Sequence, residues 1–169
     1  MRFFLVLFLF ALILSSCSQT FYIVRHAEKA GADSNATMMS NDPLLTEAGK
    51  ERAEALKDFL KTKKIGAIFS TNTFRTKFTA EPTRAYFNLV TEKYPVIPDS
   101  MFISKLKSVK KNCLIVGHSN TVDDIVNKLC ASIKIPGDLA ETEYDNLFVV
   151  KKKGRQFNFE HKKYGTLSQ

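Results

Sequence analysis

Short apolar runs alternate with longer amphipathic or polar segments along most of this chain. Residues 21–24, 65–69 and 113–116 are apolar runs of the length and composition that buried β-strands have. From Thr46 to about residue 63, apolar side chains recur at helical spacing, and Thr46 can cap the N-terminus of that helix. The pattern therefore predicts three buried strands and a helix between the first two.

The later segments predict further helices. A helix is expected from about Phe74, and Pro82 should kink or interrupt it. Residues 94–99 contain two prolines and predict an irregular connection, followed by a short helix over 100–109. Ser119 can cap one more helix, whose apolar positions at helical spacing are Val122, Ile125, Val126 and Leu129.

Near its end the chain predicts a β-hairpin, with residues 144–150 and 156–159 on either side of Gly154. Strands and helices thus alternate before a terminal hairpin. This order predicts an α/β fold: a three-layer sandwich whose mainly parallel central sheet is flanked by helices. In such sheets ligands bind beyond the carboxyl ends of the strands.

The N-terminus has a different character. Arg2 is followed by an uncharged apolar run, residues 3–14, which has the length of a signal-peptide core and is short for a membrane span. Leu14-Ser15-Ser16-Cys17 resembles the bacterial lipobox, in which the cysteine is lipidated and becomes the first mature residue. We therefore expect a lipoprotein signal peptide at 1–16, a single domain at 17–169, and a bacterial cell-envelope protein anchored to the membrane through Cys17. The alternative is a buried apolar helix with a chance cysteine.

The chain is basic, with a formal net charge of +8. Without residues 1–16 it keeps 24 basic and 17 acidic side chains. Such a surplus favours anionic partners such as phosphate esters, lipid headgroups or acidic glycans, or simply serves solubility. Export makes nucleic acid an unsuitable partner. Cys113 and Cys130 are expected to be two buried thiols, because a strand-to-helix spacing rarely suits a disulfide.

Chemically active residues follow the predicted strands. Arg25 and His26 follow the first strand, Arg75 comes shortly after the second, and His118 follows the third. Because parallel strands end at one edge of a sheet, two imidazoles and two guanidiniums should converge there, without the spacing of a metal site.

Such a group of side chains suits a phosphoryl group. Guanidiniums bind phosphate oxygens in pairs, and the helix expected after Ser119 would add its positive N-terminal end. A neutral imidazole can attack phosphorus in line, and water can then hydrolyse the phosphohistidine. Imidazole is available in its neutral and charged forms near neutrality.

Four segments together resemble the histidine phosphatase superfamily, which includes cofactor-dependent phosphoglycerate mutases and small phosphohistidine phosphatases. The first of them, Phe21–Glu28, is similar to the family's Arg-His-Gly-Glu signature with Ala27 in place of Gly. The others, in family order, are Asp42–Gly49, Ser70–Pro82 and Val116–Val122.

The resemblance implies that His26 is the nucleophile, that His118 stabilises the transferring phosphoryl group, and that Arg25 and Arg75 bind its oxygens. It also implies a metal-independent phosphatase without a cofactor that acts on phosphate monoesters or phosphoramidates. Phosphoglycerate mutase-type transfer, a catalytically weak phosphate-binding module and a zinc enzyme are the alternatives. Membrane proximity points to a small phosphorylated substrate, such as an envelope sugar or lipid; phosphohistidine proteins are mostly cytosolic.

The chain departs from the mutase-like members in lacking the motif of their mid-chain general acid, a glutamate. Glu28, Glu92, Asp99 and Asp124 are open candidates, and Asp124 equally suits the positive N-terminus of its helix. Without a strong acid, the leaving group should be a good one or the enzyme slow.

Overall fold

The computed structural model describes residues 18–31 and 42–168. Cys17 and the expected signal peptide lie outside the described residues. Within the described part of the chain, no helix has the length and apolar character that crossing a membrane requires.

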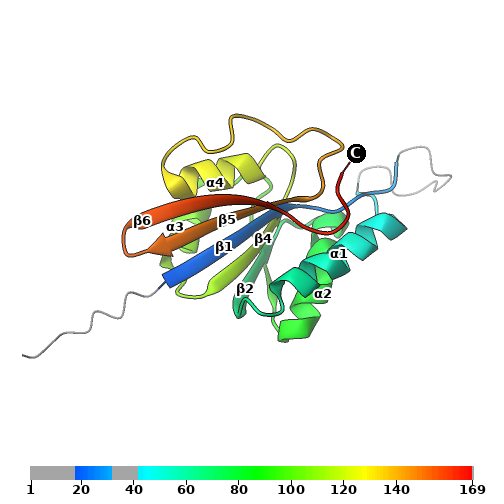
Figure 1. The fold of residues 1–169 in the computed structure, drawn as a ribbon, viewed down its shortest axis with the longest axis horizontal. Helices are drawn as coiled ribbons and strands as arrows, with labels where there is room; N and C mark the ends of the chain where they lie inside the picture. Colours follow the sequence, from blue (N-terminus) through cyan, green and yellow to red (C-terminus); the bar gives the residue numbers. More distant parts are fainter. Residues whose placement is uncertain (1–17, 32–41, 169) are drawn as a thin grey trace, which may run out of the picture.

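The centre of the domain is one sheet of six strands in the order β3-β2-β4-β1-β5-β6. The four strands from β3 to β1 are parallel, β5 runs antiparallel to β1, and β6 pairs antiparallel with β5 (Figure 1). The strands are β1 Ser18–Arg25, β2 Ile65–Ser70, β3 Thr91–Lys93, β4 Asn112–Gly117, β5 Asn146–Lys153 and β6 Gln156–Lys163.

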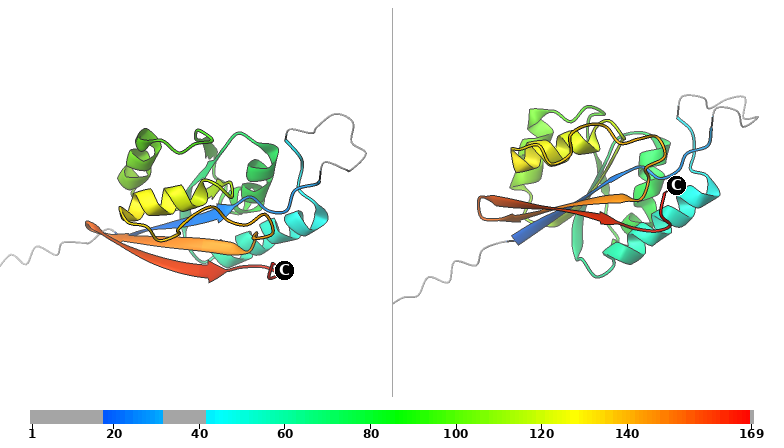
Figure 2. Two further views of the ribbon diagram at one scale, coloured as in Figure 1. Left: turned by 90° about the horizontal axis from the view of Figure 1, so that it is seen from above. Right: turned by 45° about the horizontal axis from the view of Figure 1, so that its top comes forward.

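Helices cover both faces of this sheet, as the two views of Figure 2 show. They are α1 Glu47–Leu60, α2 Phe74–Phe87, α3 Ser100–Ser108 and α4 Val122–Cys130. Phe21 and Ile23 of β1 are buried with side chains from α3 and α4. The alternate residues Tyr22 and Val24 are buried with side chains from α1 and α2. Because strand side chains alternate between faces, one apolar run supplies both cores, and the predicted three-layer sandwich is confirmed.

The local predictions are confirmed in most places. Thr46 caps α1 by accepting a hydrogen bond from the Gly49 amide over 3.1 Å. Gly154 adopts φ 61° in the turn between β5 and β6, a backbone conformation that glycine adopts without strain. The helix expected at residues 100–109 is α3.

Three details differ from the predictions. First, α2 continues through Pro82 to Phe87, because the buried face around Thr79 and Ala80 holds the helix where one backbone donor is missing. Second, α4 begins after Thr121 and not after Ser119. Third, the short strand β3 was not predicted. It is mostly exposed, so it shows no apolar pattern and becomes a strand only by pairing with β2.

Candidate active site

The two histidines meet because their strands are in register. Arg25 of β1 pairs with Gly117 of β4, and the His26 amide donates to the Gly117 carbonyl over 2.9 Å. His26 and His118 therefore each lie one position beyond a paired residue on adjacent parallel strands. Their ring centroids are 5.6 Å apart in an edge-to-face arrangement, and both side chains are buried.

Contacts around His26 set its tautomer. Its Nδ1 lies 2.8 Å from the Ala27 carbonyl oxygen, which can only accept a hydrogen bond. Nδ1 therefore carries the proton, and Nε2 keeps a free lone pair. Burial lowers the pKa of His26 to about 3, and the Arg25, His118 and Arg75 charges act in the same direction, whereas the Ala27 carbonyl raises it. His26 is thus a neutral imidazole throughout the physiological pH range.

His118 is held from both ring nitrogens. Its Nε2 lies 3.0 Å from Thr71 Oγ1, and its Nδ1 lies 3.4 Å from Arg75 Nη2. Because a guanidinium can only donate, Nδ1 accepts and Nε2 donates to Thr71. Burial first, and then the charges of Arg75 and Arg25, lower the pKa of His118 to about 4. The ring is therefore neutral and fixed in orientation, and a bound anion would favour its protonation.

Arg75 lies in the first turn of α2, where its guanidinium bridges His118 and Asp42. Asp42 Oδ1 is 3.2 Å from Arg75 Nη1, and both carboxylate oxygens accept from the Phe74 amide, over 3.0 and 2.8 Å. Asp42 thus caps the N-terminus of α2 from a distant segment and holds Arg75. Sequence reasoning quoted Asp42 in a motif but gave it no role. The signal was a carboxylate at the end of a polar connection that returns to the active edge of the sheet.

Arg25 adjoins the histidines but points differently from Arg75. It is 1% exposed, and its Nη1 donates to carbonyls of the 140–143 segment, including Ala140 over 2.7 Å. Nη2 pairs with the Glu141 carboxylate at 3.0 Å, and the guanidinium carbon lies 4.2 Å from the Tyr144 ring centroid. The structure therefore brings His26, His118 and Arg75 together, with Arg25 beside them and bound to the loop before β5.

Two buried donors of these arginines have no partner among the described residues: Nε of Arg25 and Nε of Arg75. Unpaired buried N–H groups cost free energy unless a ligand or water accepts from them. They supply the donors that an anion at this edge of the sheet would use.

The candidate general acids are engaged elsewhere. Glu28 forms a close ion pair with Arg52, whose Nη2 is 2.6 Å from Glu28 Oε1. Glu92 pairs with Lys105 at 2.5 Å and Asp124 with Lys128 at 2.9 Å. Asp99 caps α3 by accepting from the Phe102 amide. Each has a structural partner, and the Asp124 contact is a helix-surface ion pair of the i,i+4 type.

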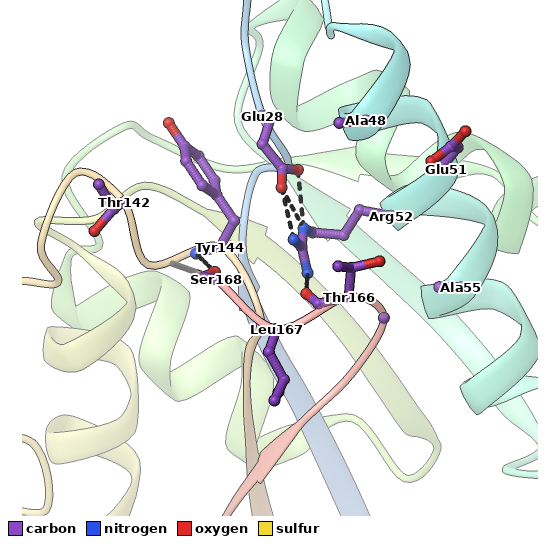
Figure 3. A pocket seen from close by; sticks show the side chains of 11 residues that line it. Glu28, Ala48, Glu51, Arg52, Ala55, Thr142, Tyr144, Thr166, Leu167 and Ser168 are labelled. Atoms are coloured by element: carbon purple, nitrogen blue, oxygen red, sulfur yellow. Dashed lines mark hydrogen bonds and ion pairs between the residues drawn. The ribbon is translucent and has the colours of Figure 1, made fainter.

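A pocket of about 680 Å³ lies between α1, the segment before β5 and the C-terminal residues (Figure 3). Glu28 and Arg52 form one wall, and Tyr144, whose ring centroid is 6.1 Å from that of His26, forms the side nearest the histidines. Arg52 also donates to the Tyr164 and Thr166 carbonyls, and Ser168 accepts from the Tyr144 amide. Residues 165–168 therefore line one side of the pocket, and Ser168 holds the Tyr144 backbone in place.

The remaining sequence predictions concern metals and thiols. The described residues contain no group of three or more His, Cys, Asp or Glu side chains arranged to hold a metal ion. Cys113 and Cys130 are both free thiols, as expected, but the prediction that both are buried is wrong for Cys130, which lies at the C-terminal end of α4. Cys113 is buried, which raises the pKa of its thiol to about 11, and Cys130 is partly exposed.

Comparison with known proteins agrees with this geometry. Residues 21–99 match the family model described as histidine phosphatase superfamily (branch 1). The matched segment is just under half of the chain. Members of this superfamily are phosphatases or mutases. No curated protein matches the sequence.

Several solved structures share the fold. The protein histidine phosphatase SixA, solved with tungstate, is 20% identical over 85% of this chain and 96% of its own, with a TM-score of 0.65. A phosphoglycerate mutase from Bacillus anthracis is 14% identical over 86% of this chain and 92% of its own, with a TM-score of 0.61. Bacillus stearothermophilus YhfR is 17% identical over 83% of this chain and 94% of its own, with a TM-score of 0.60.

Proposed function

We propose that this protein is a member of the histidine phosphatase superfamily and a phosphatase that hydrolyses phosphate monoesters or phosphoramidates through a phosphohistidine on His26. The observation that carries the proposal is the neutral, buried His26 imidazole, whose Nδ1 is fixed by the Ala27 carbonyl and whose ring centroid is 5.6 Å from that of His118. The tungstate complex of SixA adds support, since tungstate is a tetrahedral oxyanion like phosphate.

The reaction has two displacements. His26 Nε2 attacks phosphorus while the bond from phosphorus to the leaving oxygen or nitrogen breaks, and that atom keeps the electron pair and takes a proton. Water then attacks phosphorus, the P–N bond breaks, and phosphate and the free imidazole are released. Arg75, His118 and the unpaired Arg25 Nε would stabilise the charge on the phosphoryl oxygens during both steps.

The source of the proton for the leaving group limits which substrates can be hydrolysed quickly. Glu28, Glu92, Asp99 and Asp124 all have other partners, so water or a weakly placed acid would supply this proton. Substrates with good leaving groups, such as aryl or enol phosphates and phosphoramidates, should therefore be hydrolysed fastest.

The pocket beside Tyr144 is the proposed site of the leaving group. Its lining includes the Glu28 and Glu51 carboxylates and the hydroxyls of Thr142, Thr166 and Ser168. A polar, hydroxyl-rich leaving group would find hydrogen-bond partners there that a hydrocarbon chain would leave unpaired.

Trapping of the intermediate tests the proposal. The protein is mixed with a ³²P-labelled aryl phosphate, quenched in alkali and digested, and a label on the His26 peptide is expected. His26→Asn should lose both label and turnover. His161→Asn, on β6, is the matched control and should keep both. Turnover without a label on His26 would overturn the proposed mechanism.

The same assay separates the alternatives. A phosphate-binding module would bind tungstate without hydrolysing any ester in a broad panel. A mutase would transfer the label to a phosphoglycerate acceptor faster than to water. A zinc enzyme would lose activity with a chelator and regain it with zinc. A phosphatase of the proposed type should be inhibited by tungstate and unaffected by a chelator.

A further inference from the structure

The amino-terminal edge of the sheet, opposite the active site, is strongly basic. Three segments lie there: 61–65 before and at the start of β2, 107–112 before and at the start of β4, and 151–156 at the end of β5 and the start of β6. Together they carry ten basic residues and no acidic residue. The ten are Lys61, Lys63, Lys64, Lys107, Lys110, Lys111, Lys151, Lys152, Lys153 and Arg155, and we call them the basic face.

Hydrogen bonds show that these segments form one continuous surface. The Lys63 carbonyl accepts from Asn112 Nδ2 over 2.7 Å, which joins the first segment to the second. Lys152 Nζ donates to the Lys107 carbonyl, which joins the third segment to the second. The Lys111 side chain also packs against Gly66 at the start of β2.

Little of this charge is neutralised within the domain. Among the ten, only Lys61 and Lys151 form ion pairs with described residues, with Asp58 and Glu160 respectively. Those two carboxylates are shared, Asp58 also with Lys57 and Glu160 also with Lys162. The side chains of Lys64, Lys110, Lys111, Lys153 and Arg155 are exposed.

At the opposite edge, one segment carries charge of the other sign. The segment 136–145, which leads into β5 beside the active site, has four acidic residues and no basic one. Between the two edges lies the length of β1, about 23 Å for eight residues in extended conformation. The basic face therefore lies at the end of the strands away from the histidines.

The chain itself indicates what the basic face meets. In the sheet, β1 lies between β4 and β5, so its first residue, Ser18, emerges within the basic face, beside the β5–β6 turn in Figure 1. Cys17 and the apolar run 3–14 precede Ser18 in the sequence. A tether that enters a lipid bilayer would therefore draw this face toward the headgroups, where clustered lysines favour anionic lipid.

We propose that the basic face docks on an anionic lipid surface and holds the active site at the far end of the domain, away from the membrane. In this orientation the site opens toward the aqueous compartment. Its substrates would then be soluble phosphorylated compounds and not phospholipids of the bilayer that carries the protein. The docking does not depend on the proposed phosphatase activity.

The test uses the full chain in vesicles of phosphatidylcholine alone or with about one third phosphatidylglycerol. An amine-acetylating reagent is added, and mass spectrometry gives the acetylation rate of each lysine. Lys110, Lys111 and Lys153 should react at least about threefold more slowly in the phosphatidylglycerol vesicles, and high salt should abolish the difference. Lys50, which is 64% exposed in the first turn of α1, is the internal control and should react equally in both.

Charge-reversal variants complete the design. Lys110→Glu combined with Lys111→Glu should remove the protection of Lys153, whereas Lys50→Glu should leave it intact. Equal rates in both vesicle types, or protection of Lys50 instead, would overturn the proposal. Protection by an added DNA duplex but not by phosphatidylglycerol would assign the face to nucleic acid. Because acetylation is read without substrate, an inactive enzyme would not affect this result.

A second readout tests the orientation itself. Turnover of a soluble aryl phosphate should be the same in both vesicle types, because docking leaves the site open. A marked fall in the phosphatidylglycerol vesicles would show that the site faces the bilayer and would overturn the inferred orientation.

Discussion

At the scale of single residues, the site depends on neutral imidazoles kept in a cationic surrounding. Desolvation and the nearby arginines both disfavour the charged form of His26 and His118. Neutrality is what a histidine nucleophile needs, and the same arginines that lower the pKa values would attract the phosphoryl group. The two properties therefore arise from one arrangement.

The depressed pKa values have a consequence for stability. The ordinary histidine pKa is 6.5, and the folded-state values are about 3 for His26 and about 4 for His118. Between these values the unfolded chain binds more protons than the folded one, so the free energy of unfolding falls as the pH is lowered through this window. Each histidine should therefore lower the free energy of unfolding by on the order of 2 kcal/mol when the pH falls from 7.5 to 5.

Chemical denaturation at the two pH values measures this loss. His118→Asn should be less sensitive to acid than the wild type, and His161→Asn is the comparison at an exposed position. An unfolding free energy that is equal at pH 7.5 and pH 5 in the wild type would contradict the expected shift.

Asp42 is expected to position Arg75. In Asp42→Asn the amide oxygen can still cap α2, but the ion pair to Arg75 Nη1 is lost. The guanidinium should then be less well placed, and kcat/KM should fall by about tenfold, mainly through KM. Steady-state kinetics measure the change, with Asp124→Asn as the control because its ion pair with Lys128 is on the surface of α4. An unchanged KM would show that Asp42 does not position Arg75, and a lower KM would show that Asp42 instead weakens anion binding.

At the scale of elements, the site depends on a close approach between α1 and the segment after β1. The Glu28 carbonyl accepts from the Thr46 amide over 2.9 Å, and Glu28 pairs with Arg52 of α1. Gly49 makes this approach sterically feasible, since a Cβ there would lie 2.2 Å from the Glu28 oxygen. Helix α1 therefore holds in place the residues that come immediately after His26.

Gly49→Ala tests this packing. Alanine usually stabilises a helix relative to glycine, but here the clash with backbone should outweigh that gain and lower the free energy of unfolding by about 2 kcal/mol. Denaturant titration measures the change. Gly137→Ala, where a Cβ meets nothing within 4 Å, should be nearly neutral. A Gly49→Ala protein as stable as the wild type would mean that α1 can move away from Glu28.

At the scale of the whole molecule, the parallel sheet separates the sites of the two proposed functions. Its carboxyl edge gathers the histidines, while its amino edge carries the basic face and the start of β1. Catalysis and attachment can therefore occupy opposite ends of one small domain without competing for residues.

The proposed lipid anchor is tested by Cys17→Ser. Without the thiol the lipid cannot be attached, so the protein should lose incorporation of labelled palmitate in a bacterial host and should no longer be processed after residue 16. Cell fractionation and mass spectrometry measure both. Cys130→Ser, which alters a partly exposed thiol on α4, should leave labelling and processing unchanged. Palmitate labelling that survives Cys17→Ser would refute the anchor.

The sequence by itself determined most of the elements and the edge of the sheet at which the candidate site lies. Apolar runs of strand length, a capped amphipathic helix and a glycine turn are local signals, because backbone geometry and burial act over a few residues. Arg25, His26, Arg75 and His118 were found because parallel strands end at one edge. The short strand β3 was missed because it has no apolar pattern of its own. It is a strand only because it pairs with β2.

Only the tertiary structure decided which polar side chains pair with one another. In the folded protein Glu28 pairs with Arg52 and Asp42 pairs with Arg75. Most Arg25 donors bind the 140–143 segment, and all these contacts join residues far apart in the chain. The tertiary structure also joined three lysine-rich segments into one face. Such pairings depend on distances and angles in the folded chain, so no short stretch of sequence encodes them.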